Sequence, residues 1–295
     1  MEKIKGIKKV MKGFGSEILY YLYGMWPLNK KNIKVMNMDE TIDIMLNTDK
    51  SLVRFGDGEM ELIRGKNISF QSTDARLAEE LKNILFFDND NFVVALPDIF
   101  DGVDQYIMPS QHFWKEHLLF CRRIYIQNCN RNKVYASAFF SRCYFSIADK
   151  KQCSRWFEKI KSIWKDCEIV IIEGCRAHSG VENDLFDQAK MVERIICPSD
   201  NAYQFYSAIL EKCRVFPRTK LMLVSLGPTA KVLAADLFGS GYRVIDIGNL
   251  DIEYEWYIHG ELTKARYSKN DMVTVQENLT AGYTKYLDEI KYRIS

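Results

Sequence analysis

Mostly apolar runs that end at a glycine or a proline recur along the chain and predict buried β-strands. The clearest runs are apolar throughout, as is typical of parallel strands that are covered by helices on both faces. The predicted strands are 51–55, 92–96, 168–174, 221–226 and 242–247. A further, more polar strand is predicted at 123–127.

Segments with apolar residues at helical spacing separate these strands. The predicted helices are 39–48, 156–164, 184–190 and 230–238. The last helix ends at Gly239-Ser240-Gly241, which is typical of a C-cap. The order of strand, helix and strand over 221–247 predicts a right-handed crossover. We therefore predict an α/β fold, a Rossmann-like doubly wound sheet of mostly parallel strands.

The first 36 residues differ from the rest, with eight lysines against two glutamates. Apolar residues recur there at helical spacing, and an aromatic cluster follows at 20–26. Such a basic helix can lie in a membrane interface, with lysines toward anionic lipid and rings at headgroup depth. The alternative is a helix packed on the domain with solvated lysines. We assign 1–38 to a basic helical extension and 39–295 to one α/β domain.

Composition narrows the class of protein and its expected partners. Of the 295 residues, 47% are hydrophobic and 27% are charged, as expected of a folded domain, and the net charge of +2 gives no reason to expect a nucleic-acid partner. The eight cysteines and four histidines lack zinc-site spacing. No signal peptide and no membrane-spanning run is recognised, so we expect a cytoplasmic protein with reduced thiols.

An acidic loop follows the first predicted strand of the α/β domain. Asp57 and Glu59 are separated by Gly58 and preceded by Gly56. Ligands of open parallel sheets bind at the carboxyl ends of strands, and Mg²⁺ and Mn²⁺ prefer carboxylate oxygens. The two acids can therefore converge on a divalent cation, although most Asp-x-Glu sequences are simply solvated loops.

Gly227-Pro228-Thr229 follows another buried strand and opens a helix, where free N–H groups favour phosphate. The alternative is a simple helix cap by Thr229. The segment is neither a Walker A loop nor a Gly-x-Gly-x-x-Gly fingerprint, which argues against kinase-type ATP binding and ordinary NAD binding. Candidate clamps for a diphosphate or carboxylate are Arg54, Arg142 and Arg176.

Asp251, Glu253 and Glu255 alternate along the chain, so on an extended segment they would share a face. One of them could deprotonate an acceptor hydroxyl. The alternative is that the apolar residues between them form the buried face and the acids are solvated.

Several of these segments together resemble one family. They are 53–59, 141–144, 180–186, 194–198, 226–237 and 245–256, and they stand in the same order across roughly residues 40–262. The chain resembles the glycosyltransferases of GT-D fold, a family once described as a domain of unknown function.

The resemblance implies a GT-D type sheet and a hexosyltransferase activity in bacterial surface polysaccharide or glycoprotein synthesis. It implies a UDP-sugar donor, a saccharide acceptor, and Mn²⁺ or Mg²⁺ held by Asp57 and Glu59. The donor-binding residues that we predict are Arg54, Gly56, Gly58, Arg142, Asn183, Asp184, Gly227, Pro228 and Thr229. The catalytic candidates are Asp251, Glu253 and Glu255, within a catalytic domain spanning 39–295.

Asn249 departs from the family pattern, in which a histidine often stands at this position. Asparagine cannot act as a general base, so that role would pass to Asp251 or Glu253, with a single displacement that inverts the anomeric centre. The alternative is a non-catalytic subunit of a glycan assembly complex that binds UDP without turnover. The basic segment 1–36 would suit a peripheral enzyme that meets a lipid-linked acceptor at the inner membrane face.

Overall fold

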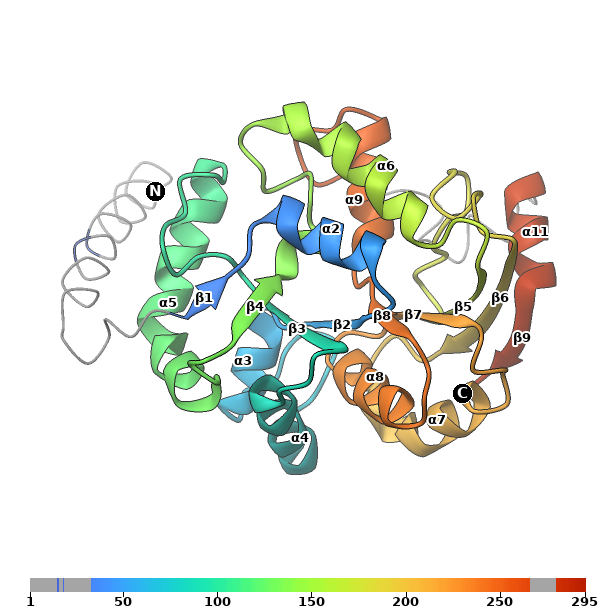
Figure 1. Ribbon diagram of the computed structural model, residues 1–295, viewed down its shortest axis with the longest axis horizontal. Helices are drawn as coiled ribbons and strands as arrows, with labels where there is room; N and C mark the ends of the chain where they lie inside the picture. The colour runs from blue at the N-terminus through green and yellow to red at the C-terminus, as the bar shows by residue number, and fades with distance from the viewer. Residues whose placement is uncertain (1–14, 16–17, 19–32, 266–279) are drawn as a thin grey trace, which may run out of the picture.

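The computed structural model describes residues 15, 18, 33–265 and 280–295. In this part of the chain nine parallel strands form one sheet, ordered β1-β4-β3-β2-β8-β7-β5-β6-β9 (Figure 1). The strands are β1 Lys34–Val35, β2 Ser51–Arg54, β3 Phe92–Leu96, β4 Val134–Ser137, β5 Glu168–Gly174, β6 Met191–Cys197, β7 Leu221–Ser225, β8 Val244–Asp246 and β9 Ile290–Arg293. The predicted doubly wound α/β sheet is confirmed.

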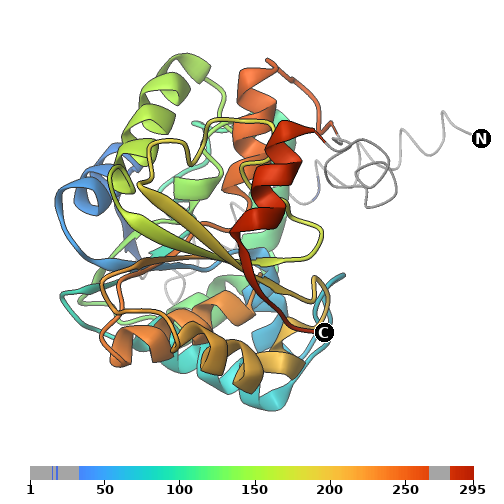
Figure 2. The ribbon, with the colours of Figure 1, turned by 90° about the vertical axis from the view of Figure 1, so that its right-hand side faces the viewer.

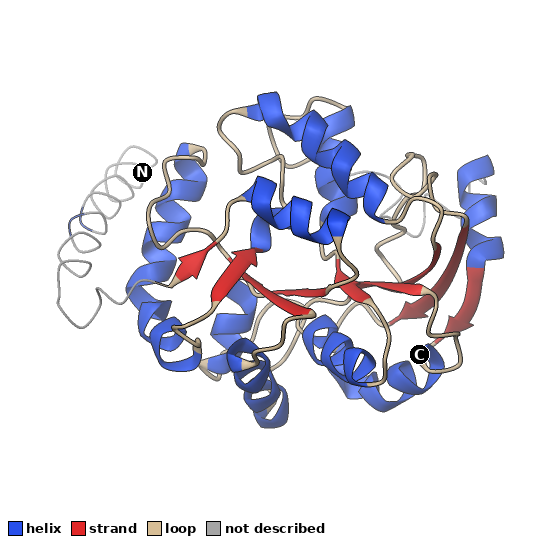
Figure 3. Cartoon of the chain, in the orientation of Figure 1, coloured by secondary structure: helices blue, strands red, loops and turns tan. Residues whose placement is uncertain are grey.

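Helices cover both faces of the sheet (Figures 2 and 3). One face packs against α2 Met38–Asn47, α6 Cys153–Ile163 and α9 Leu250–Ile258. The other packs against α3 Asp57–Ile63, α4 Ala75–Phe86, α7 Tyr206–Cys213 and α8 Thr229–Gly239. The long helix α5 Met108–Asn128 contributes to both cores, and α11 Ala281–Glu289 lies along the β6–β9 edge.

The central strands β2 and β8 set the position of a binding crevice. From β2 the chain continues outward through β3 and β4, whereas β7, β5 and β6 lie on the other side of β8. The chain therefore leaves β2 toward one edge of the sheet and leaves β8 toward the other edge. At such a switch point the carboxyl ends of the strands are the usual place for a ligand.

Local chemistry explains the start of α2 and the end of α8. The Asn37 side chain caps α2 by accepting a hydrogen bond from the Glu40 N–H at 2.9 Å. The Glu40 carboxylate accepts in turn from the Asn37 N–H, also at 2.9 Å. Helix α8 ends at Gly239, and Gly241 follows with a φ of +88°. The predicted C-cap region is thus confirmed.

Two predicted elements are wrong. Residues 123–127 belong to α5 and are not a strand, because Trp114, Leu118, Cys121 and Tyr125 recur every three or four residues and are all buried. Residues 184–190 form a turn and a bend and not a helix. The Asn183 side chain accepts from the Leu185 N–H at 3.0 Å and so stabilises a turn in place of a first helical turn.

The N-terminal boundary also shifts. Ile33 is buried in the core and β1 pairs with β4, so the sheet domain includes residues that the sequence assigned to the extension 1–38. The segment predicted to contact membrane, residues 1–36, lies outside the described residues except for 15, 18 and 33–36. Within the described ranges, no helix is long and apolar enough to cross a bilayer.

Candidate functional site

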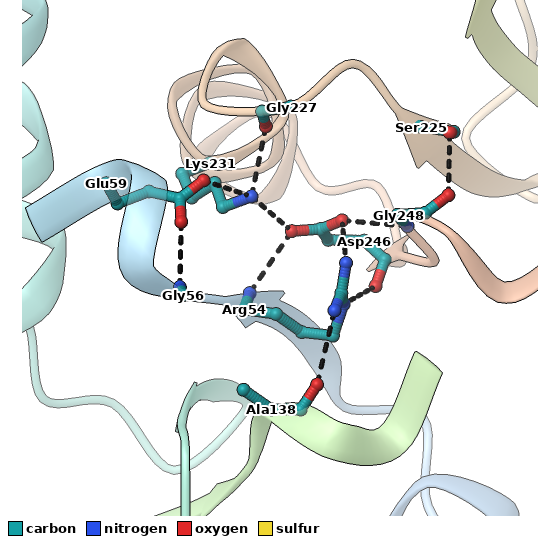
Figure 4. Close-up of polar contacts among 9 residues, drawn as sticks. All are labelled: Arg54, Gly56, Glu59, Ala138, Ser225, Gly227, Lys231, Asp246 and Gly248. Atoms are coloured by element: carbon teal, nitrogen blue, oxygen red, sulfur yellow. Dashed lines mark hydrogen bonds and ion pairs between the residues drawn. The ribbon is translucent and has the colours of Figure 1, made fainter. Parts of the chain in front are cut away.

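Three loops meet at the carboxyl ends of β2, β7 and β8. They carry Gly56 to Glu59, Gly227 to Thr229, and Gly248 (Figure 4). The paired strands place these loops side by side, since β8 lies between β2 and β7. The structure thereby brings together the acidic loop and the glycine turn that the sequence predicted separately.

A buried lysine joins the three loops. The Lys231 ammonium on α8 lies 2.9 Å from Glu59 Oε1, 3.0 Å from Asp246 Oδ2 and 3.0 Å from the Gly227 carbonyl oxygen (Figure 4). Arg54 supplies the second cation, 3.3 Å from Asp246 Oδ1. Two carboxylates, Glu59 and Asp246, are thus paired with two cations, Lys231 and Arg54, in surroundings of low dielectric constant. Removing any one of the four would leave an unbalanced buried charge, which is strongly destabilising.

Asp246 is the most enclosed member of this group, with 1% of its surface exposed. Burial raises the pKa of its carboxyl, but Lys231 and Arg54 outweigh burial and hold the pKa below the usual range. Asp246 also accepts from the backbone N–H groups of Arg54 at 3.2 Å and Gly248 at 3.1 Å. It therefore stays ionised and ties β2 to the loop after β8.

Arg54 is committed to this internal network. Its Nε donates to the Asp246 carbonyl at 2.9 Å and its Nη1 to the Ala138 carbonyl at 3.2 Å. A Cβ at Gly248, where φ is +42°, would collide with the guanidinium, so this position requires glycine. These contacts engage the Arg54 guanidinium inside the protein, and its predicted contact with the donor stays a prediction.

Glu59 and Asp57 have different environments although only Gly58 separates them. Glu59 is 6% exposed, and its Oε2 accepts from the Gly56 N–H at 2.7 Å while Oε1 binds Lys231. Asp57 is exposed to solvent and forms no ion pair with any side chain in the described ranges. Surrounding protein desolvates its carboxyl and, with the charge of Glu59, raises its pKa, against a lowering by Arg142.

These contacts bear on the predicted metal pair. No cluster of three metal-ligating side chains occurs among the residues that the structure describes. Asp57 is the carboxylate that can reach an incoming cation, whereas both oxygens of Glu59 are already engaged. This donor set fits Mg²⁺ or Mn²⁺ that keeps several waters and shares its coordination with substrate phosphates.

Glu253 differs from its two acidic neighbours on α9. Its Oε2 accepts from the N–H groups of Tyr144 at 3.0 Å and Phe145 at 2.7 Å. Its Oε1 is buried and has no hydrogen-bond partner among the described residues. Burial raises the pKa of this carboxyl, against a lowering by Arg142 and the two N–H groups. Arg142 therefore acts on both Glu253 and Asp57.

Asp251 and Glu255 share a partner, Asn183, that Glu253 does not contact. The predicted extended segment is wrong, because these residues lie on the helix α9, where a spacing of four places them on one face. The Asn183 amide donates to Asp251 Oδ1 at 2.9 Å and also to Glu255 Oε1. All three acids of α9 are buried, so the alternative of solvated acids is wrong as well.

The remaining predicted residues are placed as follows. Asp184 binds Lys161 at 3.0 Å and the Tyr254 hydroxyl, and among the described residues neither Asp184 nor Asn183 forms a hydrogen bond or ion pair with the 227–229 turn. Arg176 pairs with Asp200 at 2.6 Å on the surface. Thr229 does not cap α8, since its hydroxyl is buried without a hydrogen-bond partner among the described residues.

Sequence reasoning missed Lys231 and Asp246. Both are buried charged residues next to apolar ones, Lys231 in α8 and Asp246 at the end of β8. A charge within an apolar run is either paired or functional, because an unpaired buried charge is strongly unfavourable. That signal was available but does not say which partner each charge takes.

The fold and the grouped polar residues place the protein in the class of doubly wound α/β proteins that bind ligands at the carboxyl edge of a parallel sheet. Comparison with known proteins makes the assignment specific. Residues 52–274 match the family described as "Glycosyltransferase GT-D fold", and the chain belongs to this family.

The chain is 41% identical over 246 residues to "Probable glycosyl transferase Gly" of Streptococcus gordonii. The matched residues make up 83% of this chain and 36% of that protein. It is 39% identical over 237 residues to "Glycosyltransferase GlyD" of Streptococcus pneumoniae serotype 4 (strain ATCC BAA-334 / TIGR4), covering 80% of this chain and 29% of that protein. The chain thus spans about a third of the length of these curated relatives.

A solved structure described as "A New Glycosyltransferase (DUF1792) from Streptococcus sanguinis" superposes with a TM-score of 0.83 at 37% identity. The match covers 90% of this chain and all of that one (100%). The predicted family resemblance and the GT-D fold are confirmed.

Proposed function

We propose that this chain moves a hexose-type sugar from a UDP-sugar to a hydroxyl of a saccharide acceptor, with the help of a divalent cation. The observation that carries the proposal is the position of Arg142. One guanidinium influences both Asp57, at the N-terminus of α3, and Glu253, on α9. The charge of Arg142 is thus felt by both the carboxylate that we propose for the metal and the one that we propose as the base.

Donor binding is assigned to the loops after β2, β4 and β7. At the N-terminus of α8, Pro228 has no N–H, and the N–H groups of Ala230 and Lys231 donate to the carbonyls of Gly227 and Pro228. The half-buried Gly227 is therefore the residue whose backbone N–H we assign to the diphosphate, at the positive end of the helix. Arg142 forms no hydrogen bond or ion pair through its guanidinium with a described residue, and it is available to clamp phosphate oxygens. Gly56 and Gly58 allow close backbone approach beside Asp57.

Asp57 would hold Mn²⁺ or Mg²⁺ together with the donor diphosphate. The cation would supply neutralisation of the charge that develops on the leaving diphosphate. We assign Glu59 the role of fixing the loop, because it accepts from the Gly56 N–H and from Lys231. Its negative charge also strengthens the attraction of a cation to Asp57.

Glu253 is the best candidate for the base among the three acids of α9. Burial raises the pKa of Glu253, which makes its carboxylate a stronger base, and Oε2 is fixed by two backbone N–H groups while Oε1 has no hydrogen-bond partner among the described residues. In a single displacement the acceptor oxygen would form the new bond to the anomeric carbon as the bond to the diphosphate breaks, and Glu253 would take the hydroxyl proton. The anomeric configuration would then invert.

Asp251 and Glu255 act by orientation in this scheme. The Asn183 amide holds both, so it fixes the rotation of α9 and thereby the direction of Glu253. Asn249 precedes the helix and makes no side-chain cap. The proposed mechanism does not need a histidine there, and Glu253 is the feature that favours an enzyme over a non-catalytic subunit that binds UDP.

The biological setting is part of the proposal. The two curated relatives are streptococcal proteins described as a probable glycosyl transferase and a glycosyltransferase, which suits a role in surface polysaccharide or glycoprotein synthesis. A lipid-linked acceptor at the inner membrane face would fit the basic segment 1–36. Charge reversal at Lys8, Lys9 and Lys12 should then release the protein from anionic vesicles, and unchanged vesicle binding would refute this part.

The decisive test is UDP release from a panel of UDP-sugars with saccharide acceptors and Mn²⁺. Glu253→Gln should lower kcat by about 10²–10⁴-fold with little change in UDP affinity. Asp57→Asn should lose metal-dependent UDP binding. Glu61→Gln, an acid of the same helix α3 that pairs with Arg64, is the matched control and should behave as the native protein. Full turnover by Glu253→Gln would refute the assignment of the base.

A further inference from the structure

An exposed aromatic ring stands directly on the glycine turn before α8. Phe70, in the loop between α3 and α4, is 42% exposed. A Cβ added to Gly227, where φ is +52°, would lie 2.7 Å from Cε2 of this ring. The ring therefore packs against the Gly227 backbone, and a large part of its surface stays in water.

Backbone contacts hold this ring in place. The Phe70 carbonyl accepts from the Asn201 N–H at 2.8 Å, and the Asn201 side chain accepts from the Ser72 N–H at 2.8 Å. Ile68 and Gln71 exchange backbone hydrogen bonds at 3.0 and 3.4 Å across the turn. The exposed ring is thus presented by a fixed turn, anchored to the segment after β6.

The same loop contacts the acidic turn. A Cβ at Gly58 would lie 3.3 Å from Cδ1 of Ile68, so Ile68 covers the glycine next to Asp57. Ile68 and Phe70 therefore touch both glycines that flank the proposed diphosphate site. The loop forms a wall that links Gly58 to Gly227.

We propose that Phe70 is the stacking platform for the nucleobase of the donor. This inference rests on the proposed function, in which Gly227 and α8 receive the diphosphate. A nucleobase is joined to its diphosphate through a ribose, so it must lie on a wall next to the phosphate site. A fixed, solvent-facing aromatic ring at that place matches the flat π-face of a base.

The chemistry also defines what Phe70 contributes. Every base has a π-face, so stacking adds affinity for nucleoside diphosphates in general. Single exposed apolar residues are common on proteins, and exposure alone would carry no argument. The position on Gly227, whose carbonyl binds Lys231, is what distinguishes Phe70 from exposed rings elsewhere in the described chain, such as Phe86 at the end of α4.

The test compares ligands with and without a base. UDP and inorganic pyrophosphate are each titrated with Mn²⁺ into the native protein and into Phe70→Ala, Phe70→Leu and Phe70→Trp. Phe70→Ala should raise the Kd for UDP by about tenfold, as removal of one base–aromatic stack does, and leave the Kd for pyrophosphate within about twofold. Phe70→Leu should lose UDP affinity similarly, whereas Phe70→Trp should retain it. Phe86→Ala is the control and should change neither Kd.

Two results would overturn the inference. Native UDP affinity in Phe70→Ala would show that the ring does not meet the base. An equal loss of UDP and pyrophosphate would show that Phe70 only supports the Gly227 turn. The failure of the underlying function is distinguishable, since a native protein that binds pyrophosphate but no nucleoside diphosphate would refute the donor site itself.

Discussion

Replacing Lys231 by methionine removes the cation that joins the three loops of the site. The ammonium contacts Glu59, Asp246 and the Gly227 carbonyl at 2.9 to 3.0 Å, and 4% of the side chain is exposed. Methionine has a similar length and fills the space, so no large cavity is created. The effect should therefore be electrostatic and not one of packing.

The expected loss of unfolding free energy is about 3–5 kcal/mol at pH 7, the usual result of removing one partner from a buried ion pair. Arg54 still faces Asp246 and the Gly56 N–H still faces Glu59, which argues for the lower half of that range. Since whole domains are stable by about 5–15 kcal/mol, the variant should still fold. Glu59→Gln introduced together with Lys231→Met should recover part of the loss, because one unpaired charge is then absent.

The loss should depend on pH with a defined sign. In the native protein Lys231 helps to keep the Asp246 pKa below its usual value, which stabilises the fold above about pH 4 and is lost as the pH falls. Without Lys231, only Arg54 opposes the effect of burial on Asp246, so the pKa of this carboxyl should be higher in the variant than in the native protein. The variant then binds this proton more readily in the folded state, so the difference in stability between variant and native protein should shrink from pH 7 to pH 5.

Urea unfolding followed by circular dichroism measures these differences. Lys82→Met, which alters an exposed lysine of α4 paired with Glu79, is the control and should change stability by less than about 0.5 kcal/mol. A loss below about 1 kcal/mol for Lys231→Met at pH 7 would refute the reasoning. A loss as large at pH 5 as at pH 7 would show that packing and not charge is responsible.

Two further predictions concern single side chains. Arg142→Gln should raise the Kd for UDP with Mn²⁺ by about tenfold or more, because hydrogen bonds to charged groups contribute about 1.5–3 kcal/mol, whereas Arg155→Gln, a surface variant on α6, should leave it unchanged in the same titration. Asp98, which accepts from the Tyr106 hydroxyl, has a pKa raised to about 6, mainly by burial. As the pH rises, the unfolded chain loses the Asp98 proton before the folded protein does, so this group should lower the free energy of unfolding by about 1–3 kcal/mol from pH 4 to pH 6.5. Asp98→Asn should flatten the pH dependence of stability in urea unfolding. An unchanged pH dependence would contradict the raised pKa of Asp98.

The sequence predicted the middle of the sheet well and its edges poorly. β5 and β7 are buried on both faces, so each has an unbroken apolar run that is typical of a strand inside a parallel sheet. β1 has two residues, and β9 alternates between half-buried and exposed positions, so neither forms an apolar run. β6 was missed because Glu193 and Arg194 interrupt it, although Arg194 is paired with Glu173 at 2.8 Å.

The site was predicted in place but not in its pairings. Asp57, Glu59 and Gly227 were recognised because each follows a strand, and parallel strands bring such loops together. The partner of Glu59 is Lys231, which lies 172 positions further along the chain and is unrelated to it by any local pattern. The separate role of Glu253 could not be predicted either, because a spacing of two residues means a shared face on a strand and opposite sides on a helix.

The most direct test of the account is a calorimetric titration of UDP into the full chain, first with Mn²⁺ and then with EDTA, repeated on Asp57→Asn and on the control Glu61→Gln. We predict that the native protein and the control bind UDP only with the metal, and that Asp57→Asn loses this metal-dependent binding. Equal binding of UDP by Asp57→Asn, or equal binding with EDTA, would contradict a metal–diphosphate site at Asp57.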